Sequence, residues 1–263
     1  MSSIAPVISS ITANYNNSKY LTQCLDGLIS QSTTINNIIV VDDKSTDDSW
    51  DVLNKFTMLC TYKDGFILHK KTDDYIKFTS LKNQFIFIKN EINRGPAFSR
   101  NVGVKECLEN TDVICICDSD DFYYKDKVKK SVEILRDSSK NIGLVYSDYD
   151  ILNMKDMSLF REYKEIFTYK RLYEECIVSN NSIVDASVFN KIGLYDESLY
   201  GPEDYDLWLR ISEKFPVYHI AESLYTYRLT GNNLTVATDR ERLIDHLRKV
   251  HMKKQQRMTN ESA

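Results

Sequence analysis

Residues 113–121 read VICICDSDD, in which five apolar residues are followed at once by Asp118, Ser119, Asp120 and Asp121. A short apolar run that stops at a polar cluster is typical of a buried strand ending in a loop. The three carboxylates therefore project from the rigid end of a strand. Carboxylates at this density repel one another, whereas a hard divalent cation neutralises them. The stretch predicts a Mg²⁺ or Mn²⁺ site, with an acidic turn facing solvent as the alternative for the motif taken alone.

The pattern of a strand followed by a polar loop occurs twice more before this stretch. A β-branched apolar run at 7–12 precedes a helical stripe at 20–29. A second apolar run at 37–41 precedes a helix that carries Trp50. Strands that alternate with helices in this way indicate a parallel sheet.

The loops that follow these strands are the expected ligand site. Loops at the carboxyl ends of parallel strands meet at one edge of the sheet. Asn14, Asp43 and Asp118 each follow a predicted strand, so we expect them to line one crevice. Residues 57–83 are less regular and are not assigned, and a clear apolar strand follows at 85–88.

The composition excludes several classes of protein. The chain has 263 residues, 42% of them hydrophobic, and a formal net charge of −4, which gives no general attraction to nucleic acid. No apolar run approaches the roughly 18 residues that span a bilayer, and the N-terminus lacks the pattern of a secretory signal, so we expect a cytoplasmic protein. Six cysteines without CxxC pairs argue against zinc and against disulfides. With 8 glycines and neither GxGxxG nor GxxxxGK[ST], a dinucleotide dehydrogenase and a P-loop kinase are disfavoured.

Six motifs, taken in order, resemble the family 2 glycosyltransferases with the GT-A fold. The resemblance covers residues 5 to about 230 and depends on the order and spacing of the motifs more than on any one of them. The motifs are Ala13-Asn14-Tyr15-Asn16, VDDKSTD at 41–47, NRGPAFSRNVG at 93–103, DSDD at 118–121, GLYDE at 193–197 and GPEDYDLWLR at 201–210.

The resemblance implies an α/β fold of the GT-A type, with a Rossmann-like, mainly parallel central sheet flanked by helices. Residues 1–121 would form the half that binds the nucleotide-sugar, and residues 122–235 the acceptor-binding half of the same domain. Residues 236–263 would be a C-terminal helical extension. Within it, the residues from Asp239 to Arg257 read as an amphipathic helix rich in basic side chains.

The resemblance also implies a donor site. Ala13 and Tyr15 in the first loop and Asp43 in the second would hold the nucleotide base, with the Asp43 carboxylate accepting from a base N–H. Arg100 sits where the family has an arginine facing the donor, and a planar guanidinium suits a phosphate or a sugar hydroxyl. Arg228 resembles a family residue near the diphosphate. The alternative for Arg100 is a salt bridge on the helix surface, and for Arg228 it is an ordinary surface residue.

Metal ligands are implied in the same way. In the family the Asp-x-Asp motif carries the metal bound to the diphosphate, so Asp120 would coordinate Mn²⁺ or Mg²⁺ most directly. Asp118 would lie towards the ribose or the sugar, and Asp121 would be a helper. His219 lies in the region where some relatives supply a histidine to the metal, although a partly buried histidine with a protein partner is the commoner case.

Glu203 and Asp204 match the acidic pair that supplies the catalytic base in the family. Asp204 would take the proton of an acceptor hydroxyl as that hydroxyl attacks the anomeric carbon, and Glu203 would orient the acceptor or the base. The alternative is that both carboxylates favour the N-terminal dipole of the helix that follows them. The two roles are compatible.

The chain departs from the family pattern at three places. Lys44 replaces the glycine usual after the paired aspartates, and its side chain would either reach the diphosphate or be solvated. Asn14 stands where threonine is common. Residues 57–83 are longer than usual and are expected to shape a rim for the acceptor.

The implied function is inverting transfer of a sugar, with uridine diphosphate as the carrier expected from the resemblance. The acceptor would be a glycan or polysaccharide, a glycolipid or a protein glycan. A nucleotidyltransferase that makes sugar nucleotides and a non-catalytic nucleotide- or carbohydrate-binding module are the alternatives. The basic C-terminal helix also raises peripheral contact with an anionic membrane surface.

Overall fold

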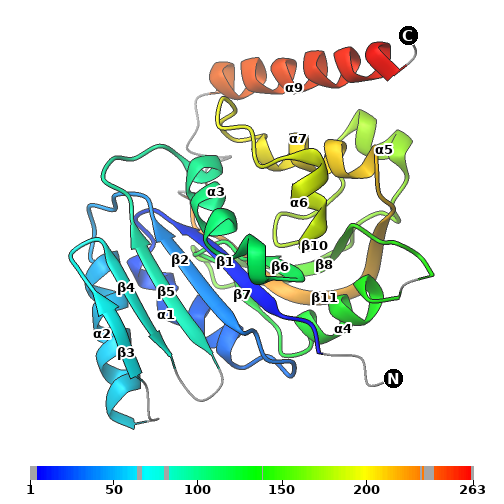
Figure 1. The fold of residues 1–263 in the computed structure, drawn as a ribbon. Helices are drawn as coiled ribbons and strands as arrows, with labels where there is room; N and C mark the ends of the chain where they lie inside the picture. The colour runs from blue at the N-terminus through cyan, green and yellow to red at the C-terminus, as the bar shows by residue number, and fades with distance from the viewer. Residues whose placement is uncertain are drawn as a thin grey trace.

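The centre of the molecule is a sheet of four parallel strands, in the order β5 (Gln84–Lys89), β2 (Asn37–Asp42), β1 (Ile8–Asn14) and β6 (Val113–Ile116). These strands are almost wholly buried, as parallel strands covered on both faces must be. The computed structural model describes residues 5–63, 67–79, 83–137, 139–231, 233 and 240–261. The predicted α/β fold with a parallel centre is confirmed (Figure 1).

Antiparallel strands extend both edges of this centre, and the described residues form one sheet of 11 strands. On one side β4 pairs with β5, and β3 with β4. On the other side the short β10 is antiparallel to both β6 and β8, and β11 runs parallel to β8. The outer strands β7 and β9 pair with β11 and β8. The bounds are β3 (Ile67–Lys71), β4 (Tyr75–Thr79), β7 (Phe122–Tyr123), β8 (Leu144–Asn153), β9 (Leu159–Glu162), β10 (Ile183–Asp185) and β11 (Val217–Leu229).

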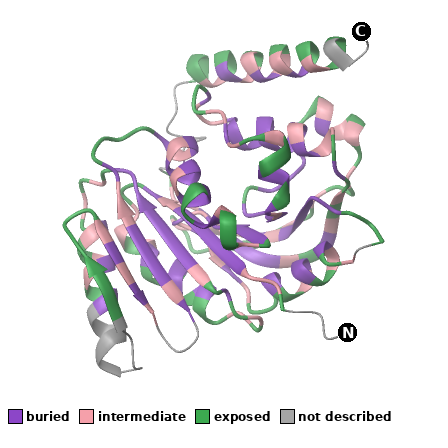
Figure 2. Cartoon of the chain, viewed as in Figure 1, coloured by how far each residue is buried: buried purple, intermediate pink, exposed green. Residues whose placement is uncertain are grey.

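Helices cover both faces of this sheet (Figures 1 and 2). Apolar side chains of α1, α2 and α4 form one core cluster, and those of α3, α5, α6 and α7 form another. Successive residues of β2 alternate between the two, with Ile38 in the first and Ile39 in the second, so the clusters lie on opposite faces. The bounds are α1 (Ser18–Ile29), α2 (Ser49–Lys63), α3 (Pro96–Cys107), the 3₁₀ turn η1 (Leu108–Asn110), α4 (Lys127–Leu135), α5 (Tyr169–Glu174), α6 (Ser187–Ile192), α7 (Glu203–Ser212) and α9 (Arg240–Glu261).

Helix α3 lies unusually close to β1 because a glycine faces the strand. A Cβ atom at Gly103 would lie 2.6 Å from the Cγ2 atom of Ile11, which no larger residue can accommodate without movement. The helix begins at Pro96, whose fixed φ suits a first turn, directly after Gly95 at φ 89°. This seating brings Arg100 within ion-pair distance of the loop that follows β6.

Residues 57–83 contain the end of α2 and the antiparallel hairpin of β3 and β4. The hairpin extends the sheet beyond β5, and its Phe78 ring stacks on Phe85 with 4.7 Å between ring centroids. No described residue of this stretch lines the pocket discussed below. Antiparallel pairing places the described residues of this stretch at the edge of the sheet beyond β5, and the expectation that the stretch shapes an acceptor rim stays a prediction.

Helix α9 lies over α7 on the outside of the molecule (Figure 1). Its Val250 side chain is fully buried in the core, and its buried Lys254 ammonium donates to the carbonyl of Tyr173. Arg257 pairs with Glu213 at 2.9 Å. Of the helices that the structure describes, none combines the length and the apolar character needed to cross a bilayer.

Candidate functional site

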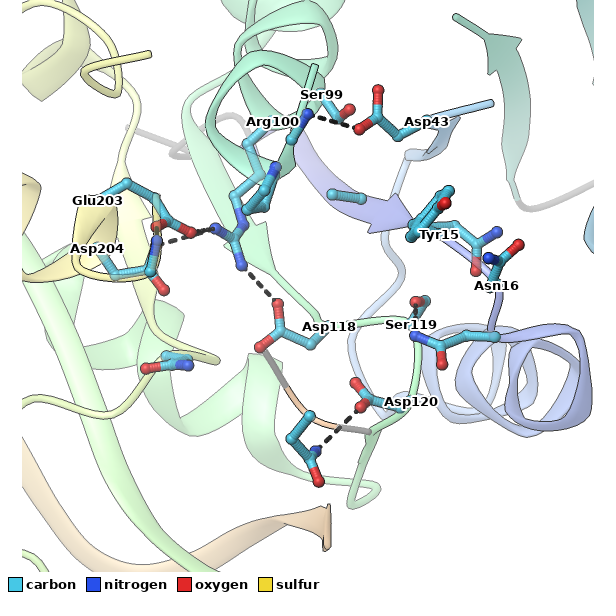
Figure 3. Close-up of a pocket in the computed structure, with 18 of the residues that line it drawn as sticks. Tyr15, Asn16, Asp43, Ser99, Arg100, Asp118, Ser119, Asp120, Glu203 and Asp204 are labelled. Carbon is cyan, nitrogen blue, oxygen red and sulfur yellow. Dashed lines mark hydrogen bonds and ion pairs between the residues drawn. The ribbon is translucent and has the colours of Figure 1, made fainter. Parts of the chain in front are cut away.

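A pocket of about 390 Å³ opens at the carboxyl ends of the central strands (Figure 3). Its walls come from the loops after β1, β2 and β6, the start of α3, the loop before α7 and the segment around the end of β11. The three loops expected to converge therefore do share one pocket. The lining residues are Ala13, Asn14, Tyr15, Asn16, Asn17, Asp43, Asn93, Gly95, Pro96, Ser99, Arg100, Asp118, Ser119, Asp120, Asn180, Tyr200, Gly201, Glu203, Asp204, Tyr227 and Asn233.

The Asp43 carboxylate ties the end of β2 to the start of α3. It accepts from Asn90 Nδ2 at 2.8 Å and from the backbone N–H of Gly95 at 2.7 Å, and the N–H of Arg94 lies 3.1 Å from its Oδ1 atom. A carboxylate has about four acceptor positions, so one remains for a ligand donor. Ala13 and Tyr15 lie on the same wall, with the Tyr15 side chain half exposed.

The two departures in these loops have local structural explanations. Lys44 adopts φ 62°, the left-handed conformation that favours glycine. Its side chain is exposed and is not among the pocket-lining residues, which fits the solvated alternative. Asn14 donates through Nδ2 to Asp42 Oδ1 at 2.8 Å and so supports the first aspartate of the pair.

The turn 118–121 presents its carboxylates alternately. Asp118 and Asp120 line the pocket, whereas Asp121 is fully buried behind it. The Asp121 carboxylate accepts from Asn181 Nδ2 at 2.6 Å and from the backbone N–H of Arg228 at 2.8 Å. Asp121 is therefore a support of the turn, and the expectation that it helps to bind a metal is wrong.

Arg228 also supports this turn and is not among the residues that line the pocket. Its guanidinium donates to the backbone carbonyl of Asp120 and to Oε1 of Gln23 on α1, and the residue is 1% exposed. Its donors are thus directed at the back of the turn. The Arg228 guanidinium therefore does not face the pocket in which the donor is expected, and the neighbouring Tyr227 lines that pocket instead.

Arg100 connects the acidic turn to the acidic pair at the start of α7 (Figure 3). Its Nη2 atom lies 2.8 Å from Asp118 Oδ1, and its Nη1 atom lies 2.8 Å from Glu203 Oε1 and 3.1 Å from Asp204 Oδ1. The arginine and both residues of the pair are buried. The surface location in the alternative for Arg100 is therefore wrong, and one guanidinium contacts three carboxylates, whose charges it offsets only in part.

Glu203 and Asp204 form the first turn of α7, where the helix dipole favours acidic side chains. Glu203 Oε2 also accepts from the backbone N–H of Gly201 at 2.8 Å. Burial raises the pKa of Asp204 to about 8; the Arg100 charge opposes this rise, and the charges of Glu203 and Asp118 add to it. A carboxylate whose pKa lies near neutrality is suited to exchanging a proton with a ligand.

His219 does not join the other expected metal ligands. Its Nε2 atom lies 2.7 Å from Asp148 Oδ1, and its ring stacks on Tyr146 at 4.8 Å between centroids. On β11 it pairs with Tyr146 of β8, whereas Arg228 pairs with Leu152, six residues further along β8, which corresponds to about 20 Å of strand. The expectation that His219 binds the metal is therefore wrong.

Asp118 and Asp120 are the residues here that fit a divalent cation. Burial and the nearby charge of Asp118 raise the pKa of Asp120 to about 7, the behaviour of a carboxylate whose countercharge is incomplete. Within the described ranges, no three acidic, histidine or cysteine side chains form a metal-binding group. A hard cation at these two carboxylates would complete its shell with phosphate or water oxygens.

The sequence interpretation missed several residues that line or support the pocket. Tyr200 lies directly before the motif that begins at Gly201, so extending that motif by one residue would have found it. Asn181 accepts from the N–H of Asp118 at 2.7 Å, and Asn233 donates to Asp120 Oδ2 at 3.2 Å. None of the six motifs that carry the resemblance contains these two asparagines.

Comparison with known proteins identifies similar sequences and folds. The model of the family described as glycosyl transferase family 2 matches residues 9–193. An uncharacterized glycosyltransferase of Rickettsia typhi is 26% identical over 234 residues, which are 86% of this chain and 64% of that protein. Chondroitin synthase of Escherichia coli is 25% identical over 88% of this chain and 30% of its own length. The Escherichia coli UDP-Glc:alpha-D-GlcNAc-diphosphoundecaprenol beta-1,3-glucosyltransferase WfaP is 27% identical over 79% of this chain and 71% of its own length.

Two solved structures share the fold. Residues 1–349 of S. aureus TarS in complex with UDP-GlcNAc match with a TM-score of 0.68 and 19% identity, over 93% of this chain and 65% of that one. Mannosyltransferase PcManGT from Pyrobaculum calidifontis in complex with GDP-Man and Mn²⁺ matches with a TM-score of 0.67 and 15% identity, over 97% and 65%. The chain thus spans less than two thirds of the Rickettsia typhi relative and of both solved structures.

Proposed function

The chain belongs to glycosyltransferase family 2, and on that premise we propose that it transfers a sugar from a nucleoside-diphosphate sugar to an acceptor hydroxyl with inversion. The observation that carries the proposal is the buried link Asp118–Arg100–Asp204. It joins the carboxylates suited to a donor diphosphate with the carboxylate suited to an acceptor proton. The proposed halves are residues 1–121 for the donor and 122–235 for the acceptor.

Three residues of the first two loops are proposed to hold the nucleotide base. The remaining acceptor position of the Asp43 carboxylate suits a base N–H, and the half-exposed Tyr15 offers a ring face beside Ala13. Uridine diphosphate is the proposed carrier. A divalent cation, Mn²⁺ or Mg²⁺, held by Asp118 and Asp120 would supply positive charge to the diphosphate as it leaves.

Asp204 is proposed as the base. An acceptor hydroxyl that attacks the anomeric carbon becomes acidic as the bond forms, and a carboxylate within about 3 Å can take its proton. Arg100 holds Asp204 in place and also limits the rise of its pKa, so that the carboxylate stays available as a base. Glu203, anchored by Gly201 and Arg100, is proposed to fix the orientation of the pair.

The acceptor is proposed to be a growing polysaccharide or a glycolipid, because the similar WfaP is named for a diphosphoundecaprenol acceptor. A lipid acceptor would bring the enzyme to a membrane surface. Helix α9 carries seven Lys and Arg residues against three Asp and Glu, in a chain of net charge −4, and we propose that its outer face contacts anionic headgroups. Arg248→Glu with Lys249→Glu should then reduce co-sedimentation with anionic vesicles, whereas Lys70→Glu with Lys71→Glu on the distant hairpin should not.

The test of the function is a donor screen. UDP-, GDP- and dTDP-sugars are tested by calorimetric binding and by slow donor hydrolysis, with Mn²⁺ or EDTA, on the wild type and on Asp120→Asn. The proposal expects metal-dependent binding of one donor that Asp120→Asn abolishes. Binding without turnover with any acceptor supports the non-catalytic module, and pyrophosphate release from a nucleoside triphosphate and a sugar phosphate supports the nucleotidyltransferase.

A further inference from the structure

Asn233 lies just beyond the end of β11, outside every motif noted in the sequence and outside the matched residues 9–193. The residue is 6% exposed. Its Nδ2 atom donates to Asp120 Oδ2 at 3.2 Å and to the backbone carbonyl of Arg228 at 2.8 Å. Its Oδ1 atom accepts from the backbone N–H of Thr230 at 2.8 Å. The amide therefore has a fixed orientation, with one donor directed at the Asp120 carboxylate.

Resting on the proposed function, we propose that Asn233 is a positioning residue that holds the Asp120 carboxylate in the orientation in which it binds the cation and the donor diphosphate. A carboxylate beside a second carboxylate is repelled from it, and Asp118 lies two residues away in the same pocket. A neutral amide donor anchored to the backbone of β11 opposes that repulsion without competing for the cation as a charged group would.

The opposite end of the same turn is held in the same way. Asn181 accepts from the backbone N–H of Asp118 at 2.7 Å and donates to Asp121 at 2.6 Å. Both asparagines come from the second half of the chain, whereas the carboxylates they orient belong to the first. The donor-binding carboxylates thus take their geometry from segments next to the proposed acceptor site.

The experiment measures Mn²⁺ binding directly, from the electron paramagnetic resonance signal of free Mn²⁺, with saturating UDP or GDP, on the full chain. Asn233→Ala should weaken Mn²⁺ binding about 10- to 100-fold, the usual range for removing a group that orients a metal ligand. The matched control is Thr230→Val, which removes a 3.2 Å hydrogen bond to the same Asn233 Oδ1 atom but leaves the Asp120 contact in place. Thermal unfolding of each variant monitors the fold.

Weaker Mn²⁺ binding in Asn233→Ala, with wild-type affinity in Thr230→Val, supports the inference. An unchanged Mn²⁺ affinity in Asn233→Ala overturns the inference. An equal loss of affinity in Thr230→Val also overturns it, because the effect would then come from the local structure around Thr230 and Asn233 and not from the contact with Asp120. If Asn233→Ala does not fold, Asn233→Leu, which keeps a side chain of similar shape but has no hydrogen-bond donor, takes its place with the same criteria. A wild-type chain that binds neither Mn²⁺ nor nucleotide refutes the proposed function itself, a result distinct from each of these.

Discussion

Replacing Arg100 with methionine is expected to destabilise the fold by about 3–5 kcal/mol at pH 8.5, the usual cost of removing one partner from a buried ion pair. The wild-type guanidinium lies 2.8, 2.8 and 3.1 Å from three carboxylates, and its side chain is 6% exposed. Methionine fills much of the same volume, so the loss is one of charge. At about 2–4 °C per kcal/mol for a chain of this size, the midpoint of thermal unfolding should fall by roughly 6–20 °C.

The loss should depend on pH in a defined direction. In the wild type the Arg100 charge lowers the pKa of Asp204; without it that pKa rises further in the folded state, so the folded variant binds a proton that the unfolded chain releases. Stability of the variant relative to wild type must then fall as pH rises through neutrality, and the deficit at pH 8.5 must exceed that at pH 5.5.

Urea unfolding at these two pH values measures both effects. Arg94→Met is the matched control, because its pair with Glu197 at 3.2 Å is solvent-exposed and should contribute less than about 1 kcal/mol. A deficit for Arg100→Met below about 1 kcal/mol at pH 8.5, or one equal at both pH values, would refute this reading of the cluster.

Three further predictions follow from single residues. Asp204→Asn should lower kcat about 10²- to 10⁴-fold with little change in the donor KM. Because the pKa of Asp204 is raised to about 8, kcat/KM of the wild type should rise with pH towards that value. A kcat/KM that stays constant from pH 6 to 9 contradicts the assignment of Asp204 as the base. Lys44→Gly should raise the free energy of unfolding by up to about 1 kcal/mol, because residue 44 sits at φ 62°, whereas Lys44→Ala should not; chemical denaturation of both variants decides it. Burial lowers the pKa of Lys127 to about 7, so Lys127→Met should stabilise the fold by at least about 1 kcal/mol at pH 7. This gain in stability should shrink as the pH rises towards the ordinary pKa of lysine. A gain that does not depend on pH counts against a buried amine.

The parts of the fold that could be predicted are those for which a local sequence pattern can be combined with a general rule of sheet topology. The apolar runs at β1, β2 and β6 indicated buried strands, and the edge rule for parallel sheets then placed Asn14, Asp43 and Asp118 in one pocket.

The features that could not be predicted have a different cause, because each depends on how segments far apart in the sequence pair in the folded chain. His219 lies far from the turn because β11 is a long strand, and the pattern around it does not reveal where along the strand it falls. Arg228 sits at the correct end of that strand, but its guanidinium reaches the back of the turn through contacts with Gln23 and Asp120. The role of residues 57–83 depends on antiparallel pairing at the sheet edge, which the alternation of helices and strands does not predict.

The short strand β10 has a mechanical consequence. It bonds to β6 on one side and to β8 on the other, so one hydrogen-bonded ladder runs from the proposed donor loops to the strands of the proposed acceptor half. Bilobed enzymes with a hinge align their substrates by closing, but a continuous sheet leaves no such degree of freedom between these two sets of residues. The distance between the anomeric carbon and the attacking hydroxyl would then be fixed when the protein folds. A substitution at Val184 that weakens the pairing of β10 with its neighbours should therefore reduce turnover before it reduces affinity for either substrate.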